Sequence, residues 1–175
     1  METIGSGAVT APFTAAEDSD CIIVIGARPT ENHPVAATFL KAAAKRGAKL
    51  ILMDPRGYAL TRHADHFLQF KPGTDVALLN AMMHTIVEED LVDAQYITGY
   101  TEGYDALRDS LADFTPETMS AVCGVDAETI RTVARVYATS KRSIIFWGMG
   151  ISQSVHGTDN ARCLISLALM TGQVG

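Results

Sequence analysis

Two short segments carry groups that could bind a phosphorylated nucleoside. Residues 26–33 read Gly-Ala-Arg-Pro-Thr-Glu-Asn-His, in which Gly26 allows a close backbone turn and the Arg28 guanidinium can pair with a diphosphate. This segment lacks the Gly-x-Gly-x-x-Gly pattern of a standard NAD site, so a plain connecting loop is the alternative. Residues 54–56 read Asp-Pro-Arg, and Asp54 could either accept hydrogen bonds from ribose hydroxyls or simply open a turn.

Two further segments add candidate contacts to a ligand. Residues 72–75 read Pro-Gly-Thr-Asp and put Asp75 at the start of a predicted helix, where a carboxylate either complements the helix dipole or accepts N–H groups of a guanine edge. Residues 147–153 read Trp-Gly-Met-Gly-Ile-Ser-Gln. Their glycines allow the backbone to approach a ligand closely, and the Gln153 amide can donate and accept at once. Met149 and Gln153 could equally serve loop packing, so both interpretations stay open.

The histidines and cysteines do not form a recognisable reactive site. His63 and His66 stand three residues apart while the other histidines are scattered, so we predict no protein-built metal site. Neither Gly-x-Ser-x-Gly nor His-Glu-x-x-His occurs, and no catalytic residue is predicted. Cys21, Cys123 and Cys163 are isolated from one another, which excludes a Cys-x-x-Cys motif, and we expect reduced, buried thiols in an intracellular protein.

The four candidate segments stand at the ends of predicted strands. Short continuous apolar runs are typical of strands that are covered on both faces. Such runs occur at residues 21–26, 48–54, 66–70 and 143–147. Because helical patterns separate them, we predict an α/β fold of three layers, a Rossmann-like and mainly parallel sheet between helices. Ligands of such sheets bind at the carboxyl ends of the strands, where the candidate groups stand.

Helical periodicity connects the strands. Pro34 suits a first helical turn, and the apolar stripe expected after it comprises Val35, Phe39, Leu40 and Ala43. Helices also follow the third and fourth predicted strands. The stretch from about 89 to 140 has no strand candidate and is predicted to be a helical excursion, with helix starts at Thr115 and Asp126. Its buried stripe is predicted to be Ile130, Val133, Ala134 and Tyr137.

Composition and charge limit the class of protein. The 175 residues, 47% of them hydrophobic and 19% charged, fit a single globular domain. The net charge of −6 comes from scattered acids and bases without a basic stripe, so nucleic acid is not expected as a partner. No apolar run approaches the roughly 20 residues that span a bilayer, and the N-terminus lacks a signal-peptide pattern, so no membrane insertion is expected.

In this order and spacing, the four segments resemble the molybdopterin oxidoreductase family. Thr-Glu-Asn-His-Pro-Val at residues 30–35, Asp-Pro-Arg, Pro-Gly-Thr-Asp-Val-Ala-Leu-Leu-Asn and Trp-Gly-Met-Gly-x-x-Gln are similar to the branch of formate dehydrogenase α-subunits. The resemblance covers nearly the whole chain. One departure is Gly26-Ala27-Arg28, where relatives often have Gly-Ser-Asn or Gly-Ala-Asn, so that a guanidinium replaces an amide at position 28.

The resemblance implies a cofactor, bis-molybdopterin guanine dinucleotide with molybdenum or tungsten, and a role for each segment. The first loop would approach the diphosphate and pterin, residues 54–56 the nucleoside, residues 73–75 the guanine, and the last segment the cofactor toward its pterin. The implied cofactor-binding residues are Gly26, Ala27, Arg28, Thr30, Glu31, Asn32, His33, Asp54, Pro55, Arg56, Gly73, Thr74, Asp75, Met149 and Gln153.

The resemblance also implies what this chain leaves to other parts of the protein. The family's iron–sulfur cysteine cluster, its Cys or selenocysteine metal ligand and its formate-binding arginine have no match here. We therefore expect residues 1–175 to be one cofactor-binding domain of a longer formate dehydrogenase subunit, inactive alone, with the 4Fe–4S cluster outside it. The implied partners are the remaining domains of the same subunit and electron-transfer subunits, in the cytoplasm or, as in some family members, the periplasm.

Three alternatives stay open at this point. The chain could belong to another molybdopterin oxidoreductase, such as a nitrate reductase, or to a respiratory-complex subunit that keeps the fold without the cofactor. It could be a plain Rossmann-like nucleotide-binding module, although the helical excursion and the Trp-Gly-Met-Gly turn do not suit the central domain of thiamine-diphosphate enzymes. A purely structural interaction domain is the third alternative, which a failure to bind guanine nucleotides would favour.

Overall fold

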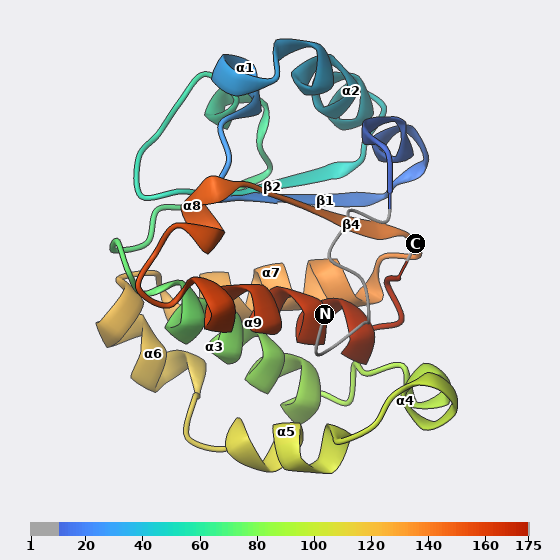
Figure 1. Ribbon diagram of the computed structural model, residues 1–175, viewed down its shortest axis with the longest axis vertical. Coiled ribbons are helices and arrows are strands. Elements are labelled where there is room, and N and C mark those ends of the chain that lie inside the picture. Colours follow the sequence, from blue (N-terminus) through green and yellow to red (C-terminus); the bar gives the residue numbers. More distant parts are fainter. Residues whose placement is uncertain (1–10, 175) are drawn as a thin grey trace.

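The computed structural model describes residues 11–174, which fold into a parallel sheet between two layers of helices (Figure 1). The strands are β1 (Cys21–Ile25), β2 (Lys49–Met53), β3 (His66–Leu68) and β4 (Ser143–Trp147). Their order is β3-β2-β1-β4, and each pairing is parallel. The predicted three-layer α/β fold with a mainly parallel sheet is confirmed. Because the strand order reverses beside β1, the carboxyl ends of β1 and β4 form the switch point at which ligands of such sheets bind.

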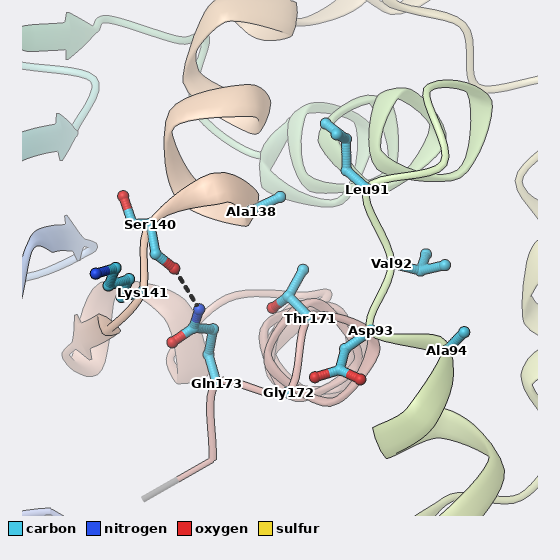
Figure 2. A pocket seen from close by; sticks show the side chains of 10 residues that line it. All are labelled: Leu91, Val92, Asp93, Ala94, Ala138, Ser140, Lys141, Thr171, Gly172 and Gln173. Carbon is cyan, nitrogen blue, oxygen red and sulfur yellow. Dashed lines mark hydrogen bonds between the residues drawn. The ribbon is translucent and has the colours of Figure 1, made fainter.

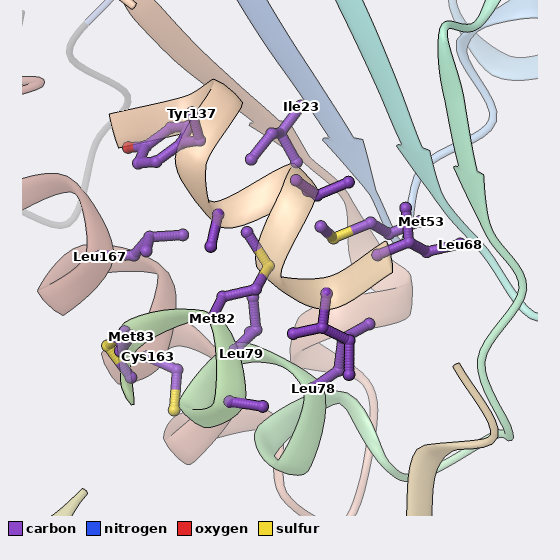
Figure 3. Close-up of a cluster of buried hydrophobic side chains, with 14 of the residues drawn as sticks. Ile23, Met53, Leu68, Leu78, Leu79, Met82, Met83, Tyr137, Cys163 and Leu167 are labelled. Carbon is purple, nitrogen blue, oxygen red and sulfur yellow. The ribbon is translucent and has the colours of Figure 1, made fainter. Parts of the chain in front are cut away.

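The sheet is buried on both faces, as the continuous apolar runs predict. Successive side chains of a strand point to opposite faces, so Ile22 and Val24 pack with one helical layer while Ile23 and Ile25 pack with the other. All five residues of β1 are buried. Figure 3 shows Ile23 with residues of β2, β3 and the second helical layer in one apolar cluster. This shared core fixes the strand ends at which the candidate site lies.

The first layer covers one face with η1 (Phe13–Asp18), α1 (Pro29–Asn32) and α2 (Pro34–Lys45). Pro34 occupies the first helical position of α2, as predicted. The predicted stripe is partly wrong, because Val35 is 72% exposed. The buried positions of α2 run through Ala36, Ala37, Leu40 and Ala43, so that Val35, one residue before this stripe, faces away from the sheet.

The second layer covers the other face with α3 (Asp75–Glu88), α7 (Ala127–Thr139) and α9 (Gly157–Met170). The helix α6 (Pro116–Cys123) packs on α3 and α7, and the remaining helices of the excursion lie farther from the sheet (Figure 1). These are α4 (Ala94–Tyr100) and α5 (Tyr104–Ser110). Residues 89–140 thus contain no strand, and the predicted helical excursion is confirmed.

The predicted helix starts of the excursion are confirmed by their hydrogen bonds. Thr115 Oγ1 accepts the backbone N–H of Thr118 over 3.2 Å, and Asp126 Oδ2 accepts that of Thr129 over 3.0 Å. The predicted stripe of α7 is buried, namely Ile130, Val133, Ala134 and Tyr137. Its burial explains why the excursion returns to the sheet before β4.

Some local elements differ from the sequence prediction. β3 was expected over residues 66–70 but ends at Leu68, because the chain then leaves the sheet and Lys71 donates its backbone N–H to the carbonyl of Cys123 over 2.8 Å. Single helical turns, α1 and α8 (Met149–Ser152), occupy segments expected to be loops, and a 3-10 turn, η2, spans Thr61–His63. The domain predicted over residues 1–175 extends past the described residues at both ends, so its bounds stay a prediction.

The cysteines are buried and unbonded to one another, as predicted. Burial raises the pKa of Cys21 to about 12 and that of Cys163 to about 11, which keeps both thiols protonated at neutral pH. They behave as small core residues. No helix in the described part of the chain is long and apolar enough to cross a bilayer.

Candidate functional site

A cavity of about 880 Å³ lies where the segments after β1, β2 and β4 meet the loop before α3. This volume falls within the range of small-molecule and cofactor sites. The four predicted segments all contribute to its wall. The predicted site residues that line it are Gly26, Ala27, Arg28, Asn32, His33, Asp54, Pro55, Arg56, Gly73, Asp75 and Met149. Residues that stand far apart in sequence are thus brought together at the strand ends.

Four predicted site residues lie beside this cavity and not in its wall. Thr30 belongs to α1, and its Oγ1 is buried without a hydrogen-bond partner among the described residues. The exposed Glu31 pairs with Arg28, and Thr74 donates its hydroxyl to the carbonyl of Lys71 over 2.6 Å. Gln153 ends α8 on the exposed surface. Ligand contacts of these four residues stay predictions.

The loops after β1 and β4 form one continuous wall because glycines let them touch. The N–H of Gly148 donates to the carbonyl of Ile25 over 3.3 Å. Gly26 has a φ of +57°, and a Cβ there would lie 2.8 Å from the backbone nitrogen of Ile151. A Cβ on Gly150 would lie 2.7 Å from the carbonyl oxygen of Gly26. These glycines therefore serve the packing of two loops, a role distinct from the predicted close approach of Gly26 to a ligand.

Asp54 forms a turn and faces the cavity at once. Its side chain is nearly buried, with 7% of the residue exposed, and Oδ1 accepts the backbone N–H of Arg56 over 2.7 Å. Asx turns of this kind are the expected local use of Asp before Pro. The side chain of Gln69 supports the same turn by donating from Nε2 to the carbonyl of Pro55 over 3.0 Å. The turn interpretation of Asp54 is confirmed, and its contact with a ribose stays a prediction.

Asp75 is the first residue of α3 and is only 7% exposed, although it lines the cavity. Apart from its own backbone N–H, no donor among the described residues hydrogen-bonds its carboxylate. Burial raises the pKa of Asp75, because the charged form loses water and the hydrogen bond from its own backbone N–H offsets only part of that loss. A ligand that brings N–H donors would reverse this cost.

Aromatic side chains complete the cavity and were not predicted. Phe13, Phe70, Phe146 and Trp147 line it. Phe13 stacks on Phe146 with ring centroids 5.7 Å apart, and its ring lies 6.0 Å from that of His33. Trp147 and Met149 are 41% and 60% exposed, so they offer apolar surface at the rim. The end of the fourth strand could have indicated Phe146 and Trp147, whereas nothing around Phe13 signals a site.

A second, smaller hollow of about 450 Å³ lies near the amino end of β4 (Figure 2). It is bordered by residues 91–94 and 171–173, together with Ala138, Ser140 and Lys141. Gln173 closes one side, because its Nε2 donates to the carbonyl of Ser140 over 2.9 Å and its Oε1 accepts the N–H of Ser143 over 2.7 Å. None of the predicted site residues borders it, so the cavity at the strand carboxyl ends is the candidate site.

Comparison with known proteins agrees with this architecture. The molybdopterin oxidoreductase family matches residues 2–175. This chain belongs to that family. Its structure is similar to acetylene hydratase from Pelobacter acetylenicus, with a TM-score of 0.84 and 29% identity over 89% of this chain and 22% of that one. The predicted family and fold are therefore confirmed.

Formate dehydrogenase subunits are among the similar sequences. The chain is 41% identical over 171 residues to the F420-dependent formate dehydrogenase subunit alpha of Methanocaldococcus jannaschii, covering 98% of this chain and 25% of that protein. It is 38% identical over 174 residues to formate dehydrogenase H of Escherichia coli, covering 99% of this chain and 24% of that protein. The chain thus spans about a quarter of the length of these relatives.

Proposed function

We propose that the cavity at the strand carboxyl ends binds the guanosine diphosphate part of a molybdopterin guanine dinucleotide. The observation that carries this proposal is Asp75, a nearly buried carboxylate in the cavity wall that lacks donors from other described residues. The N1–H and 2-amino groups of guanine are two adjacent donors that a carboxylate can accept together. Adenine lacks this pair of donors, so the contact would select guanine.

The remaining wall fits the other parts of such a ligand. The Asp54 carboxylate, of which Oδ1 already serves the turn, has further lone pairs for ribose hydroxyls. Gly26, Ala27 and His33, from the segment after β1, line the side of the cavity proposed for the diphosphate. Trp147 and Met149 offer apolar surface toward the pterin. When bound, the cofactor and its molybdenum or tungsten ion supply two-electron redox chemistry, while these residues bind and orient the nucleotide.

For the whole protein we propose formate dehydrogenase activity, the oxidation of formate to carbon dioxide. The support is the identity of 38–41% with formate dehydrogenase subunits over nearly the whole chain. The metal ligand, the 4Fe–4S cluster and the formate-binding group would come from the other parts of the same subunit. The structural similarity to a hydratase shows why the fold alone does not decide the reaction, which depends on the groups around the metal.

Titration of GDP and ADP against the wild type and Asp75→Asn tests the nucleotide proposal. We expect the wild type to bind GDP more tightly than ADP. Asp75→Asn should weaken the binding of GDP by about 1–3 kcal/mol and change the binding of ADP little. A matched control is Asp159→Asn, because Asp159 is also in the first turn of a 14-residue helix but does not line the cavity. Equal affinities for GDP and ADP in the wild type would contradict the proposal.

A further inference from the structure

Arg28 was expected to meet a diphosphate, yet its guanidinium is engaged within the protein. Nη1 lies 3.0 Å from Oε2 of Glu31, and Nη2 donates to the carbonyl of Gly57 over 3.4 Å. The carbon Cζ lies 5.2 Å from the centroid of the Tyr58 ring. One end of the planar group is thus bound to α1, while the other end and one face contact the turn after β2. Nε is buried and has no partner among the residues the structure describes.

The turn that Arg28 contacts is the one that presents Asp54. The Asp54 side chain accepts the N–H of Arg56, and the N–H of Tyr58 donates to Oγ1 of Thr61 over 3.2 Å. Gln69 holds the Pro55 end of this turn from the β3 side, as described above. Arg28, which follows β1, contacts the other end of the turn at Gly57 and Tyr58. The turn is therefore held between its two neighbouring strand ends.

We propose that Arg28 is a positioning residue, which stacks on Tyr58 and holds the turn of residues 54–58 in the conformation that presents Asp54 to the nucleoside. This inference rests on the proposed nucleotide site and assigns Arg28 a role there that differs from diphosphate binding. A guanidinium suits the role because its flat face stacks while its edges donate, which a lysine ammonium cannot reproduce. Loss of the contact would release the turn without removing any group that touches the phosphates.

The two roles of Arg28 differ in how affinity depends on the phosphates of the ligand. Guanosine, GMP and GDP are titrated against the wild type, Arg28→Gln and Arg28→Lys. For a positioning residue we expect both variants to bind all three ligands more weakly by the same factor, about 5- to 10-fold if the released turn keeps the competent conformation for a tenth to a fifth of the time. A loss that grows from guanosine to GDP, and that lysine largely restores, would overturn the proposal and assign Arg28 to the diphosphate.

Tyr58 supplies the matched pair of variants. Tyr58→Phe keeps the ring face and should bind guanosine like the wild type, whereas Tyr58→Leu should show the loss seen in Arg28→Gln. Combining Tyr58→Leu with Arg28→Gln should add little, because both changes remove the same contact. Full additivity of the two losses would show that Arg28 and Tyr58 act separately, contrary to the proposal.

Amide hydrogen exchange tests the contact in the free protein and so separates its failure from that of the nucleotide proposal. We expect the amides of Arg56 and Tyr58 to exchange faster in Arg28→Gln and Tyr58→Leu than in the wild type, and at the wild-type rate in Tyr58→Phe. Unchanged exchange in Arg28→Gln would overturn the positioning role even if GDP binds. If the wild type binds no guanine nucleotide, the nucleotide proposal fails, but the exchange rates still test whether Arg28 holds the turn of residues 54–58. Should Arg28→Gln not fold, Arg28→Lys and Tyr58→Leu decide the outcome.

Discussion

The backbone N–H of Gly150 donates a 3.0 Å hydrogen bond to the carbonyl oxygen of Gly26, which ties the turn that opens α8 to the loop after β1. The two residues come from the loops that follow neighbouring strands, and a side chain on either would meet the backbone of the other segment. The wall of the cavity therefore depends on two positions where no side chain is present.

Gly26→Ala should destabilise the fold by about 1–3 kcal/mol, because alanine at a φ of +57° is strained and its Cβ would meet Ile151. Gly73→Ala separates the two effects, since Gly73 also has a positive φ but nothing within 4 Å of the added Cβ. Gly57→Ala is the control for an open position without positive φ. Urea unfolding of the three variants should rank Gly26 worst and Gly57 nearest the wild type, and a Gly26→Ala protein as stable as Gly57→Ala would contradict the close approach of the two loops.

Asp75→Asn should raise the thermal stability of the ligand-free protein at neutral pH while it weakens GDP binding. Burial raises the folded pKa of Asp75 above its ordinary 3.8, so the folded protein holds a proton that the unfolded chain releases. The cost of the buried charge appears as the pH rises from 3.8 through the raised pKa of the folded protein, and it persists at higher pH. The gain in thermal stability from Asp75→Asn should thus shrink as the pH falls toward 3.8. Thermal melts of both proteins over a range of pH measure this change. A variant less stable than the wild type at pH 7 would favour the helix-dipole role of Asp75.

Arg135→Lys should lower the stability of the fold slightly at neutral pH and low salt. Arg135 pairs with Glu89 through two bonds of 2.8 Å and so joins α7 to the end of α3, a geometry that lysine cannot copy. This bond to Arg135 lowers the pKa of Glu89, so the contribution is present above pH 4.5 and lost as the pH falls through the lowered folded value. Arg108→Lys, on the exposed α5, is the control and should change stability little. The same loss in 1 M salt would argue against an electrostatic cause.

Leu79→Ala should destabilise the protein by about 2–5 kcal/mol through a cavity between α3 and the sheet. Leu79 is fully buried in the cluster drawn in Figure 3, together with Ile23 and Leu78. Leu107→Ala on α5 is the comparison, because Leu107 is only partly buried against the same cluster and should cost less. Chemical denaturation measures both, and equal losses would mean that α5 contributes to the core as strongly as α3.

The sheet could be predicted from sequence because its strands are covered on both faces. Their apolar runs are continuous, and the polar residues that follow them mark the strand ends. The cavity followed from the same reasoning, since Asp54 and Asp75 both line it. What a sequence pattern could not supply was the direction of a side chain. Arg28 turns toward Glu31 and Tyr58, a choice set by contacts between segments that are distant in sequence.

Other differences have local physical causes. The one-turn helices α1 and α8 are too short for a periodic pattern, although Pro29 stands where a first helical turn accepts it. Val35 is apolar but lies outside the buried stripe of α2, and apolar periodicity alone cannot tell a core position from its neighbour in a first turn. Phe13 lines the cavity from a 3-10 turn before β1, where no motif marks it.

The strand order sets when the site can exist during folding. Cys21 of β1 pairs with Lys49 of β2 nearby in the chain, but also with Ser143 of β4, after the whole helical excursion. Closing the longer loop costs roughly 1 kcal/mol more chain entropy than closing the shorter one. We therefore expect β4 to join the sheet after β1 and β2 have paired, so that a nascent chain reaches a partly formed sheet that still lacks the part of the cavity wall between Phe146 and Ser154. Pulsed hydrogen exchange during refolding would reveal this order as later protection of β4 than of β2, and simultaneous protection would contradict it.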